Sequence, residues 1–304
     1  AEDHQAQMWF GTENGGLYLV DQETDNLEVF RSEEGNDQSL NSNSIWTLYI
    51  DNEERIWIGT ANEGGNVVDR KFNKFESYKR NPVSPQTSLT HNDVRCFAEG
   101  ENGLIWIGTD GGGICLFDPV SYGFTRQIYN TANNHILENN AVQSILHDNN
   151  YLWIGLWAGG IDRLDIPHNQ VKHYSLITDE GTEIRNIRVL FKDSHNTIWA
   201  GTAGKGLFSY NETMDSFEPV HCPNSSDILD ARAFITCMME DSEGYLWIGT
   251  LNGLVVVNNN GNQLMSCEEI IPDDSSGSVD RKMAQVIYQD TWGRCWLGTI
   301  DHGL

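Results

Sequence analysis

The sequence predicts an all-β fold built from one four-stranded unit that recurs along the chain. A motif of the form Ile/Leu-Trp-Ile-Gly-Thr occurs seven times in 304 residues, and its tryptophans are 48, 49, 47, 46, 48 and 49 residues apart. A fixed period of this size is typical of repeat proteins. Between the turn residues the stretches are short and β-branched or aromatic, without the three-four spacing of a long amphipathic helix. The motif tryptophans are Trp9, Trp57, Trp106, Trp153, Trp199, Trp247 and Trp296.

The second repeat shows how four strands fit into one period. Residues 45–51, 56–60, 66–70 and 74–78 each read as a short strand, and Gly, Asn and Asp residues separate them. Four antiparallel strands per repeat, arranged radially, form the blade of a β-propeller. We therefore expect a β-propeller of seven repeat units with four-stranded antiparallel blades, in which the terminal blades are incomplete. A six-bladed closure is the alternative.

The residue types of the motif have physical tasks in such a blade. The tryptophan supplies a large apolar area for packing against the next blade. The glycine two residues later leaves room for a neighbouring backbone. Glycine pairs such as Gly64-Gly65 permit positive φ in the following hairpin. The motif tryptophans are thus expected in the core and not in a ligand site.

The two ends of the chain fall inside repeats. Residues 1–3 align with the end of a first strand, and residues 303–304 align with the start of a third strand. We expect residues 1–304 to form a single β-propeller domain that is a fragment of a longer protein. No window is apolar enough to suggest a membrane span.

The charge and the chemistry-bearing residues exclude several functions. With 19 basic and 44 acidic residues the formal net charge is −25, which repels nucleic acid and anionic membranes. The six cysteines and nine histidines lack metal-ligand spacing, and no Gly-x-Ser-x-Gly nucleophile motif occurs. We expect no cofactor, no metal and no catalytic residue. Cys96 and Cys237 share a core position, and a pairing of Cys222 with Cys267 is left open.

A family resemblance rests on these same residues. The repeat pattern is a first strand ending in Asp, then the tryptophan motif, then Gly-Gly-Leu or Gly-Gly-Ile, then a fourth strand rich in Phe or Tyr; residues 103–119 and 241–254 show it most clearly. The chain resembles the two-component regulator propeller repeat in all seven units. Leu156 replaces the motif threonine in the fourth unit, Ala200 replaces the motif isoleucine in the fifth, and the sixth has the single glycine Gly253 where other units have two. These departures mark the fourth unit as special.

The resemblance implies a role in sensing. Propellers of this family form the extracytoplasmic sensor region of hybrid two-component histidine kinases of the Bacteroidetes type. It implies a periplasmic location in an inner-membrane protein, recognition of oligosaccharides or polysaccharide breakdown products, and control of glycan-utilisation genes. The implied partners are an oligosaccharide ligand, a second propeller, a β-sandwich and a second copy of the full-length sensor. The fragment itself is not expected to be an enzyme.

A ligand site is expected where long loops and polar inner strands meet. In a propeller the fourth-to-first and second-to-third connections share one face. Here the fourth-to-first connections are long and polar, as in residues 31–44, 79–93 and 267–282, and such loops commonly carry binding residues. The first position of the first strands is apolar, whereas the next is polar in five of six copies. This second column consists of Trp46, Arg95, Gln143, Arg188, Thr236 and Gln285.

We predict that this column lines the mouth of a channel and contacts a hydroxyl-rich or anionic ligand. Arg95 and Arg188 have the fork geometry for a carboxylate or sulfate. Trp157, in the second-to-third turn of the fourth unit, is predicted to stack on a sugar ring. The remaining predicted contacts around the mouth are Asn92, Asn140, Lys205, Arg232 and Arg281. The alternatives are a ring that only hydrates the channel or pairs with acidic neighbours, and a Trp157 that covers a loop.

Two other functional classes stay open. Propeller lyases of the streptogramin-cleaving type use similar strand motifs with histidines and a metal, although only His147 falls on a first strand here. Many propellers are protein-interaction platforms. Binding of oligosaccharides without turnover favours the sensor, and product formation favours the lyase. If neither is observed, the interaction platform is favoured.

Overall fold

The computed structural model describes residues 1–304 except 22–23, 25, 37, 70–73, 129–135, 222–232, 260–263, 271–282 and 300–304. In these residues the chain forms β-strands and two short 3₁₀ helices, η1 (Pro85–Thr87) and η2 (Glu101–Gly103). The chain divides into two compact units, Ala1–Leu152 and Trp153–Leu304. Each unit is described below by itself.

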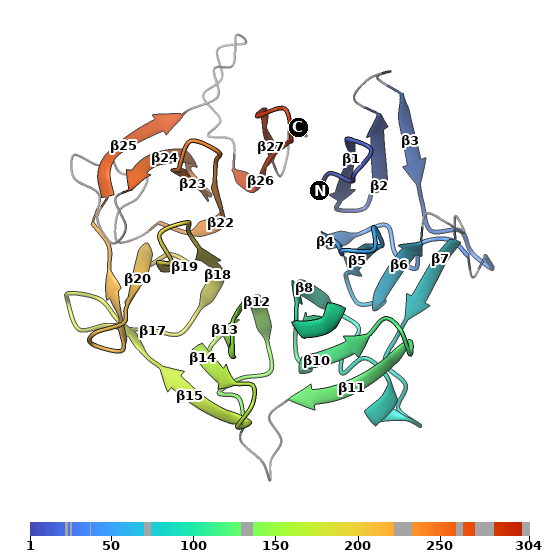
Figure 1. Ribbon diagram of the computed structural model, residues 1–304, viewed down its shortest axis with the longest axis horizontal. Helices are drawn as coiled ribbons and strands as arrows, with labels where there is room; N and C mark the ends of the chain where they lie inside the picture. Colours follow the sequence, from blue (N-terminus) through green and yellow to red (C-terminus); the bar gives the residue numbers. More distant parts are fainter. Residues whose placement is uncertain are drawn as a thin grey trace. The chain divides into compact units, whose positions relative to one another are not determined.

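The first unit contains a run of antiparallel sheets in chain order (Figure 1). Its sheets are β1-β2-β3, β4-β5-β6-β7 and β8-β9-β10-β11, followed by β12. The strands are β1 (Gln7–Thr12), β2 (Gly16–Asp21), β3 (Leu27–Phe30), β4 (Ile45–Ile50), β5 (Ile56–Thr60), β6 (Gly65–Asp69), β7 (Lys74–Tyr78), β8 (Val94–Glu99), β9 (Ile105–Thr109), β10 (Gly113–Asp118), β11 (Gly123–Ile128) and β12 (Val142–Asp148). The four strands expected in the second repeat are therefore confirmed to within a residue or two.

The second unit repeats this arrangement. The division between the units falls inside β13, a strand of the sheet β12-β13-β14-β15. The sheets β16-β17, β18-β19-β20-β21, β22-β23-β24-β25 and β26-β27 follow. The strands are β13 (Tyr151–Leu156), β14 (Gly160–Asp165), β15 (Gln170–Tyr174), β16 (Leu176–Ile177), β17 (Glu183–Ile184), β18 (Ile187–Lys192), β19 (Ile198–Thr202), β20 (Leu207–Asn211), β21 (Ser216–Pro219), β22 (Ile235–Glu240), β23 (Tyr245–Thr250), β24 (Gly253–Asn259), β25 (Leu264–Ile270), β26 (Ala284–Gln289) and β27 (Cys295–Thr299).

The described sheets do not confirm seven blades. Among the described residues, six repeats form sheets of three or four strands, and the seventh contributes the two-stranded sheet β26-β27. Six blades is the alternative that the repeat count left open, and the prediction of seven is not confirmed.

The motif tryptophans and glycines pack as predicted. Trp9, Trp57, Trp106, Trp153 and Trp199 are buried, whereas Trp247 and Trp296 are half-buried. Trp57 contacts Phe97 and Phe117 of the next sheet, with ring centroids 6.2 and 5.1 Å apart. A Cβ atom on Gly59 would lie 2.8 Å from both the carbonyl oxygen and Cγ1 of Val94. Glycine is thus required because the first strand of the next blade crosses at this point.

The cysteines fit the same packing. A Cβ atom on Gly108 would lie 2.4 Å from Sγ of Cys96, and Gly249 has the same relation to Cys237. Both thiols fill the slot beside the motif glycine, as predicted. Cys222 and the side chain of Cys267 lie outside the described residues.

In five of the seven repeats an aspartate six residues before the motif tryptophan accepts its indole hydrogen. We call this end of the first strand, with the turn to the second strand, the turn end. The pairs and their Nε1–Oδ2 distances are Trp9–Asp3 2.8 Å, Trp57–Asp51 2.9 Å, Trp199–Asp193 2.8 Å, Trp247–Asp241 2.7 Å and Trp296–Asp290 2.9 Å. The same carboxylates accept backbone N–H groups of the turn, so a buried acceptor satisfies several donors at once. In the third and fourth repeats the corresponding residues are Gly100 and His147.

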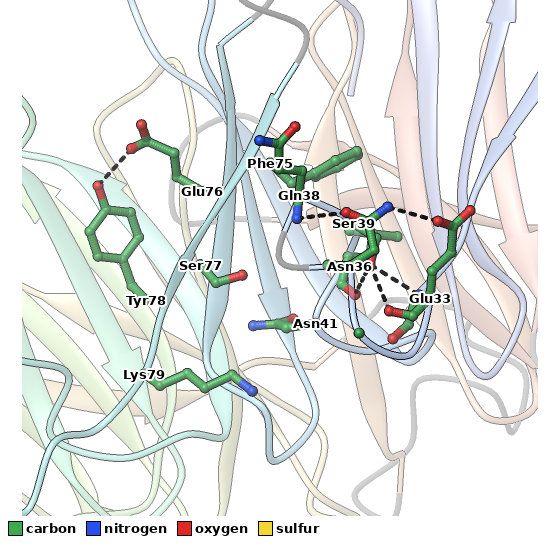
Figure 2. Close-up of a pocket in the computed structure, with 13 residues that line it drawn as sticks. Glu33, Asn36, Gln38, Ser39, Asn41, Phe75, Glu76, Ser77, Tyr78 and Lys79 are labelled. Carbon is green, nitrogen blue, oxygen red and sulfur yellow. Dashed lines mark hydrogen bonds between the residues drawn. The ribbon is translucent and has the colours of Figure 1, made fainter.

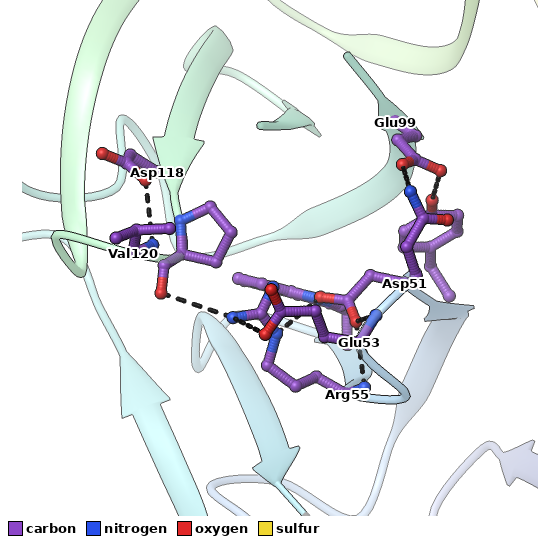
Figure 3. A network of polar contacts seen from close by, with 10 residues as sticks. Asp51, Glu53, Arg55, Glu99, Asp118 and Val120 are labelled. Atoms are coloured by element: carbon purple, nitrogen blue, oxygen red, sulfur yellow. Dashed lines mark hydrogen bonds and ion pairs between the residues drawn. The ribbon is translucent and has the colours of Figure 1, made fainter. Parts of the chain in front are cut away.

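Further polar contacts at the turn end tie neighbouring sheets together (Figure 3). Arg55 pairs with Asp51 through Nε at 2.7 Å, and its Nη1 donates to the carbonyl oxygen of Pro119 at 3.3 Å. Tyr49 and Asn52 both donate to the carboxylate of Glu99 on β8. In the second unit Ser194 donates to Glu240 in the same way. These contacts satisfy the polar groups of the turn ends that they join, whereas in the fourth repeat the buried Nε2 of His147 and Nε1 of Trp153 have no partner among the described residues.

The opposite end of each blade is where the long connections meet the second-to-third hairpins. The motif threonine closes the hairpin, as in Thr60, whose hydroxyl donates to the carbonyl of Gly64 at 2.7 Å. In the next long connection, the carbonyl of Asn92 accepts the N–H of Gly64 at 2.6 Å. These contacts place the two kinds of loop on one face of the blade, as predicted. Leu156 cannot make the threonine contact, which distinguishes the fourth repeat.

Candidate functional site

The predicted polar column coincides with a repeated backbone irregularity. In five sheets the register between the first two strands shifts around the second residue of the first strand, so that this residue lacks a partner in the ladder. The shifts flank Trp46, Arg95, Arg188, Thr236 and Gln285. Bulges of this kind turn a side chain out of the regular ladder and are common beside functional sites. We call this end of the first strand the bulge end. Gln143, the sixth member, has the same sequence position in β12.

The first unit brings two members of the column into contact. The guanidinium of Arg95 lies over the indole of Trp46, with Cζ 4.3 Å from the ring centroid. Nη2 of Arg95 is also 3.0 Å from Oδ2 of Asp93 and 3.2 Å from Oδ2 of Asp110. Asp93 precedes β8, and Asp110 belongs to the β9–β10 hairpin. We call Trp46, Arg95, Asp93 and Asp110 the bulge-end cluster.

The bulge-end cluster is partly covered and incompletely hydrogen-bonded. The side chains of Arg95 and Asp93 are 18% and 11% exposed, whereas Trp46 is 37% exposed. Oδ1 of Asp93 and Nε of Arg95 are buried and have no hydrogen-bond partner among the described residues. Burial raises the pKa of Asp93; Arg95 lowers it, Asp110 raises it further, and the net shift is upward. The two groups are therefore held at a cost that a polar ligand can reduce.

The predicted asparagines support the loops of this face. The carbonyl of Asn140 accepts the N–H groups of Gly111 and Gly113 at 3.0 and 2.9 Å. The side-chain oxygen of Asn92 accepts the N–H of Arg80 at 2.7 Å, in addition to the Gly64 contact on its carbonyl. Both residues therefore fix the hairpins around the bulge-end cluster. Their role in ligand contact stays a prediction.

The other predicted contacts lie in the second unit. The Thr236 hydroxyl is buried and donates to the carbonyl of Ala284, so its hydrogen is already used. Arg188 and Gln285 are half-buried. Lys205 is exposed in the connection between β19 and β20. Arg232 and Arg281 lie outside the described residues. The ligand role of this group stays a prediction.

Trp157 projects from the turn between β13 and β14 and is 41% exposed. The turn is fixed by the N–H of Ala158, which donates to the side chain of Asn186 at 2.8 Å. An indole on a fixed turn offers an open aromatic surface, as the stacking prediction requires.

One cavity was not predicted as a site, although its loop was. A cavity of about 680 Å³ lies between the long connection at 32–41 and the outer strand β7 (Figure 2). It is lined by Glu33, Asn36 and Gln38 on the loop side and by Phe75 and Tyr78 on the strand side. The signals in the sequence were the long connection and the Phe- and Tyr-rich fourth strand that supplies Phe75 and Tyr78.

A second feature that sequence reasoning missed is an aromatic cluster in the second unit. Trp153, Tyr174, Tyr210 and Phe217 contact one another, with ring centroids 4.8 to 6.0 Å apart. The carboxylate of Asp215 accepts from both tyrosine hydroxyls at 2.7 Å and from Lys172. These hydrogen bonds lower the pKa of Asp215, with that from Lys172 first. The Asp215 carboxylate and both tyrosine hydroxyls are hydrogen-bonded, whereas the buried Nε1 of Trp153 has no partner among the described residues. The ring contacts stabilise the packing of these strands.

The described residues contain no group of three His, Cys, Asp or Glu side chains placed to hold a metal ion. None of the helices in this part of the chain has the length and apolar character needed to cross a membrane.

Comparisons with known proteins find similarity to parts of the repeats. The family model described as two component regulator propeller matches residues 39–62, 88–111 and 231–252. Histidine kinase P4 of Formosa agariphila is 27% identical over 187 residues, which cover 58% of this chain and 13% of that protein.

Two solved structures share the fold. The extracellular domain described for the hybrid two component system BT3049 of B. thetaiotaomicron is 26% identical, with a TM-score of 0.82, over 100% of this chain and 38% of that chain. The extracellular domain described for the one component system BT4673 of B. thetaiotaomicron is 20% identical, with a TM-score of 0.62, over 98% of this chain and 46% of that chain. The β-propeller prediction is confirmed by the family match and the first of these likenesses. The chain spans less than half the length of each relative.

Proposed function

We propose that the chain is the ligand-sensing propeller of a hybrid two-component histidine kinase, because three of its segments match the two component regulator propeller model. The observation that carries this proposal is the likeness to the extracellular domain of BT3049 over the whole chain, at 26% identity and a TM-score of 0.82. On this proposal the propeller lies outside the cytoplasm, in the periplasm. Its output passes through the rest of the sensor to glycan-utilisation genes.

We further propose that the ligand is an oligosaccharide bound at the bulge end. A sugar ring offers C–H groups to an exposed indole and hydroxyls that both donate and accept hydrogen bonds. Trp46 supplies the indole, while Asp93 and Arg95 supply an acceptor and a donor without a partner among the described residues. These are the groups that a hydroxyl can satisfy. In the second unit, Trp157 is a separate candidate for stacking on a sugar ring.

The partners of the parent protein follow from the same proposal. The relatives are longer than this chain, and we propose a second propeller, a β-sandwich and a second copy of the sensor as partners. These partners carry the signal, so the propeller needs only to bind its ligand.

The test is isothermal titration calorimetry of the purified chain against a panel of oligosaccharides, with chromatography of the mixtures to detect products. We expect saturable binding without product. Product formation would instead favour the lyase alternative, and absence of binding across the panel would favour the interaction platform.

The site is tested with a matched pair of tryptophan variants. Trp46→Ala is expected to weaken binding at least tenfold, because it removes the indole of the bulge-end cluster. Trp292→Ala is the control, since Trp292 is also exposed and also carries an arginine over its ring, Arg294 at 4.2 Å, but lies at the turn end. Equal loss in both variants would place the ligand elsewhere, and a third variant, Asn36→Ala, then tests the cavity of Figure 2.

A further inference from the structure

The bulge-end cluster carries more negative than positive charge. Arg95 is its single cation, and the two carboxylates of Asp93 and Asp110 lie within 3.2 Å of the same nitrogen, Nη2. The stacked indole of Trp46 covers one face of the guanidinium. The cluster therefore has a formal charge of −1, within a chain of formal charge −25.

This arrangement works against an anionic ligand. A sulfate or carboxylate at Arg95 would replace an existing ion pair and would lie close to the displaced carboxylate. Two like charges this close repel each other near a protein surface, which disfavours the exchange. Burial is the main cause of the raised pKa of Asp93; Arg95 lowers this pKa, and the neighbouring carboxylate of Asp110 raises it.

The unpaired atoms indicate which group fits instead. Oδ1 of Asp93 needs a donor and Nε of Arg95 needs an acceptor. A hydroxyl group meets both needs, whereas a sulfate or carboxylate offers acceptors alone. An ammonium group meets the first need and adds attraction to Asp110, whose side chain is 32% exposed.

We propose that the bulge-end cluster selects neutral or amino sugars and rejects sulfated and uronic acid-containing oligosaccharides. This inference rests on the proposed function, because it assigns the charge class of the oligosaccharide bound at that site. It replaces the role first considered for Arg95, the direct binding of an anion, with a role in orienting hydroxyls between an arginine and two carboxylates.

The experiment is calorimetric titration with probes that differ in charge. The neutral probes are cellotetraose, xylotetraose, mannotetraose and N-acetylated chitotetraose; the amino probe is fully deacetylated chitotetraose. The anionic probes are trigalacturonate and a chondroitin sulfate tetrasaccharide. We expect at least one neutral or amino probe to bind more tightly than either anionic probe by tenfold or more. Tighter binding of an anionic probe would overturn the inference while supporting the sensor, and silence of all probes would count against oligosaccharide sensing itself.

A charge variant makes the test local. Asp110→Asn is expected to shift the ratio of anionic to neutral affinity about tenfold toward the anionic probes, because one carboxylate beside Arg95 loses its charge. Glu101→Gln removes an exposed carboxylate in η2 and is the control for net charge. Thermal unfolding of both variants confirms that they are folded. An equal shift in the two variants would mean that the whole chain, and not the bulge-end cluster, sets the preference.

Discussion

Two arginine–tryptophan stacks at opposite ends of the blades have the same residue types and different hydrogen bonding. At the turn end Arg294 lies 4.2 Å over Trp292 and pairs with Asp290 at 2.6 Å. At the bulge end Arg95 lies 4.3 Å over Trp46 and pairs with two carboxylates.

The difference lies in what the carboxylates still lack. Asp290 accepts the N–H groups of Trp292 and Arg294 and the indole of Trp296, so both of its oxygens are used. Oδ1 of Asp93 has no hydrogen-bond partner among the described residues, and neither has Nε of Arg95. A satisfied cluster stabilises the blade, whereas buried polar atoms without a partner call for an explanation, which the proposed ligand supplies for Asp93 and Arg95. The comparison teaches that residue type alone does not mark a site. The difference between the two ends can be tested with four sets of variants.

The largest loss of stability is expected when the turn-end carboxylate of Asp51 is removed. Asp51→Ala removes the partner of Arg55, of the Trp57 indole and of two backbone N–H groups. Loss of one partner of a buried ion pair costs about 3–5 kcal/mol, and urea denaturation should show a lower free energy of unfolding by that amount. Glu53→Ala is the control, because Glu53 is 65% exposed and 3.8 Å from Arg55, and should cost under about 1 kcal/mol. Similar costs for both would show that the network in Figure 3 adds little.

A smaller loss of stability is expected at Gly59, which supports the bulge end. A Cβ atom there would lie 2.5 Å from Cγ2 of Thr47 and 2.8 Å from the backbone oxygen of Val94, the neighbours of Trp46 and Arg95. Gly59→Ala should cost about 1–3 kcal/mol by overpacking and should weaken ligand binding as well. Gly123→Ala, whose nearest atom is 3.4 Å away, should leave the thermal midpoint nearly unchanged. A tolerated Gly59→Ala would contradict the close crossing of the strands.

Removal of Arg95 should cost about 1 kcal/mol at pH 7, which is typical for a partly exposed charged group with hydrogen bonds. Arg95→Ala leaves Asp93 and Asp110 facing each other without a cation. The cost should fall when the pH is lowered into the carboxyl range, because protonation relieves the repulsion. Thermal unfolding at pH 7 and pH 4 measures the difference. A cost that is the same at both pH values would show that only the stacking on Trp46 was lost.

The smallest expected effects are changes in the pH dependence of stability, and these have opposite signs at the bulge end and the turn end. Burial raises the pKa of Asp93; Arg95 lowers it and Asp110 raises it, with a net upward shift. Folding therefore favours protonated Asp93, and this stability is present below the ordinary carboxyl pKa and is lost as pH rises through the folded pKa. Asp93→Asn should raise the thermal midpoint relative to the parent chain more at pH 7 than at pH 3.5.

The corresponding variant at the turn end should behave in the opposite way. Burial raises the pKa of Asp290, but hydrogen bonds from Trp296 and Arg294 outweigh it and lower that pKa below the usual range. Its stability is present above the ordinary carboxyl pKa and is lost as pH falls through the folded value. Asp290→Asn should therefore be more destabilising at pH 7 than at pH 3.5. Slopes of the same sign in the two variants would contradict the distinction between the ends.

The repeat itself was readable because its signals are local. The period, the strands β4 to β7 and the roles of Gly59 and Trp57 follow from short patterns that depend on neighbours in the same unit or the next. The polar column was also found, because alternation within a strand is a local property. That its members are bulge residues was not, since the ladder register depends on the facing strand.

By itself, then, the sequence determined the all-β repeat, the packing of the motif tryptophans and the position where polar side chains leave the first strands. Only the tertiary structure decided that Asp110, from a different hairpin, shares Arg95 with Asp93, and that Arg55 reaches the carbonyl of Pro119. It also decided that the Thr236 hydroxyl is already bound to Ala284. The physical reason is that periodicity fixes each strand and its exposed positions, whereas the partner of a charged or polar group is set by side chains and carbonyls that folding brings from elsewhere in the chain.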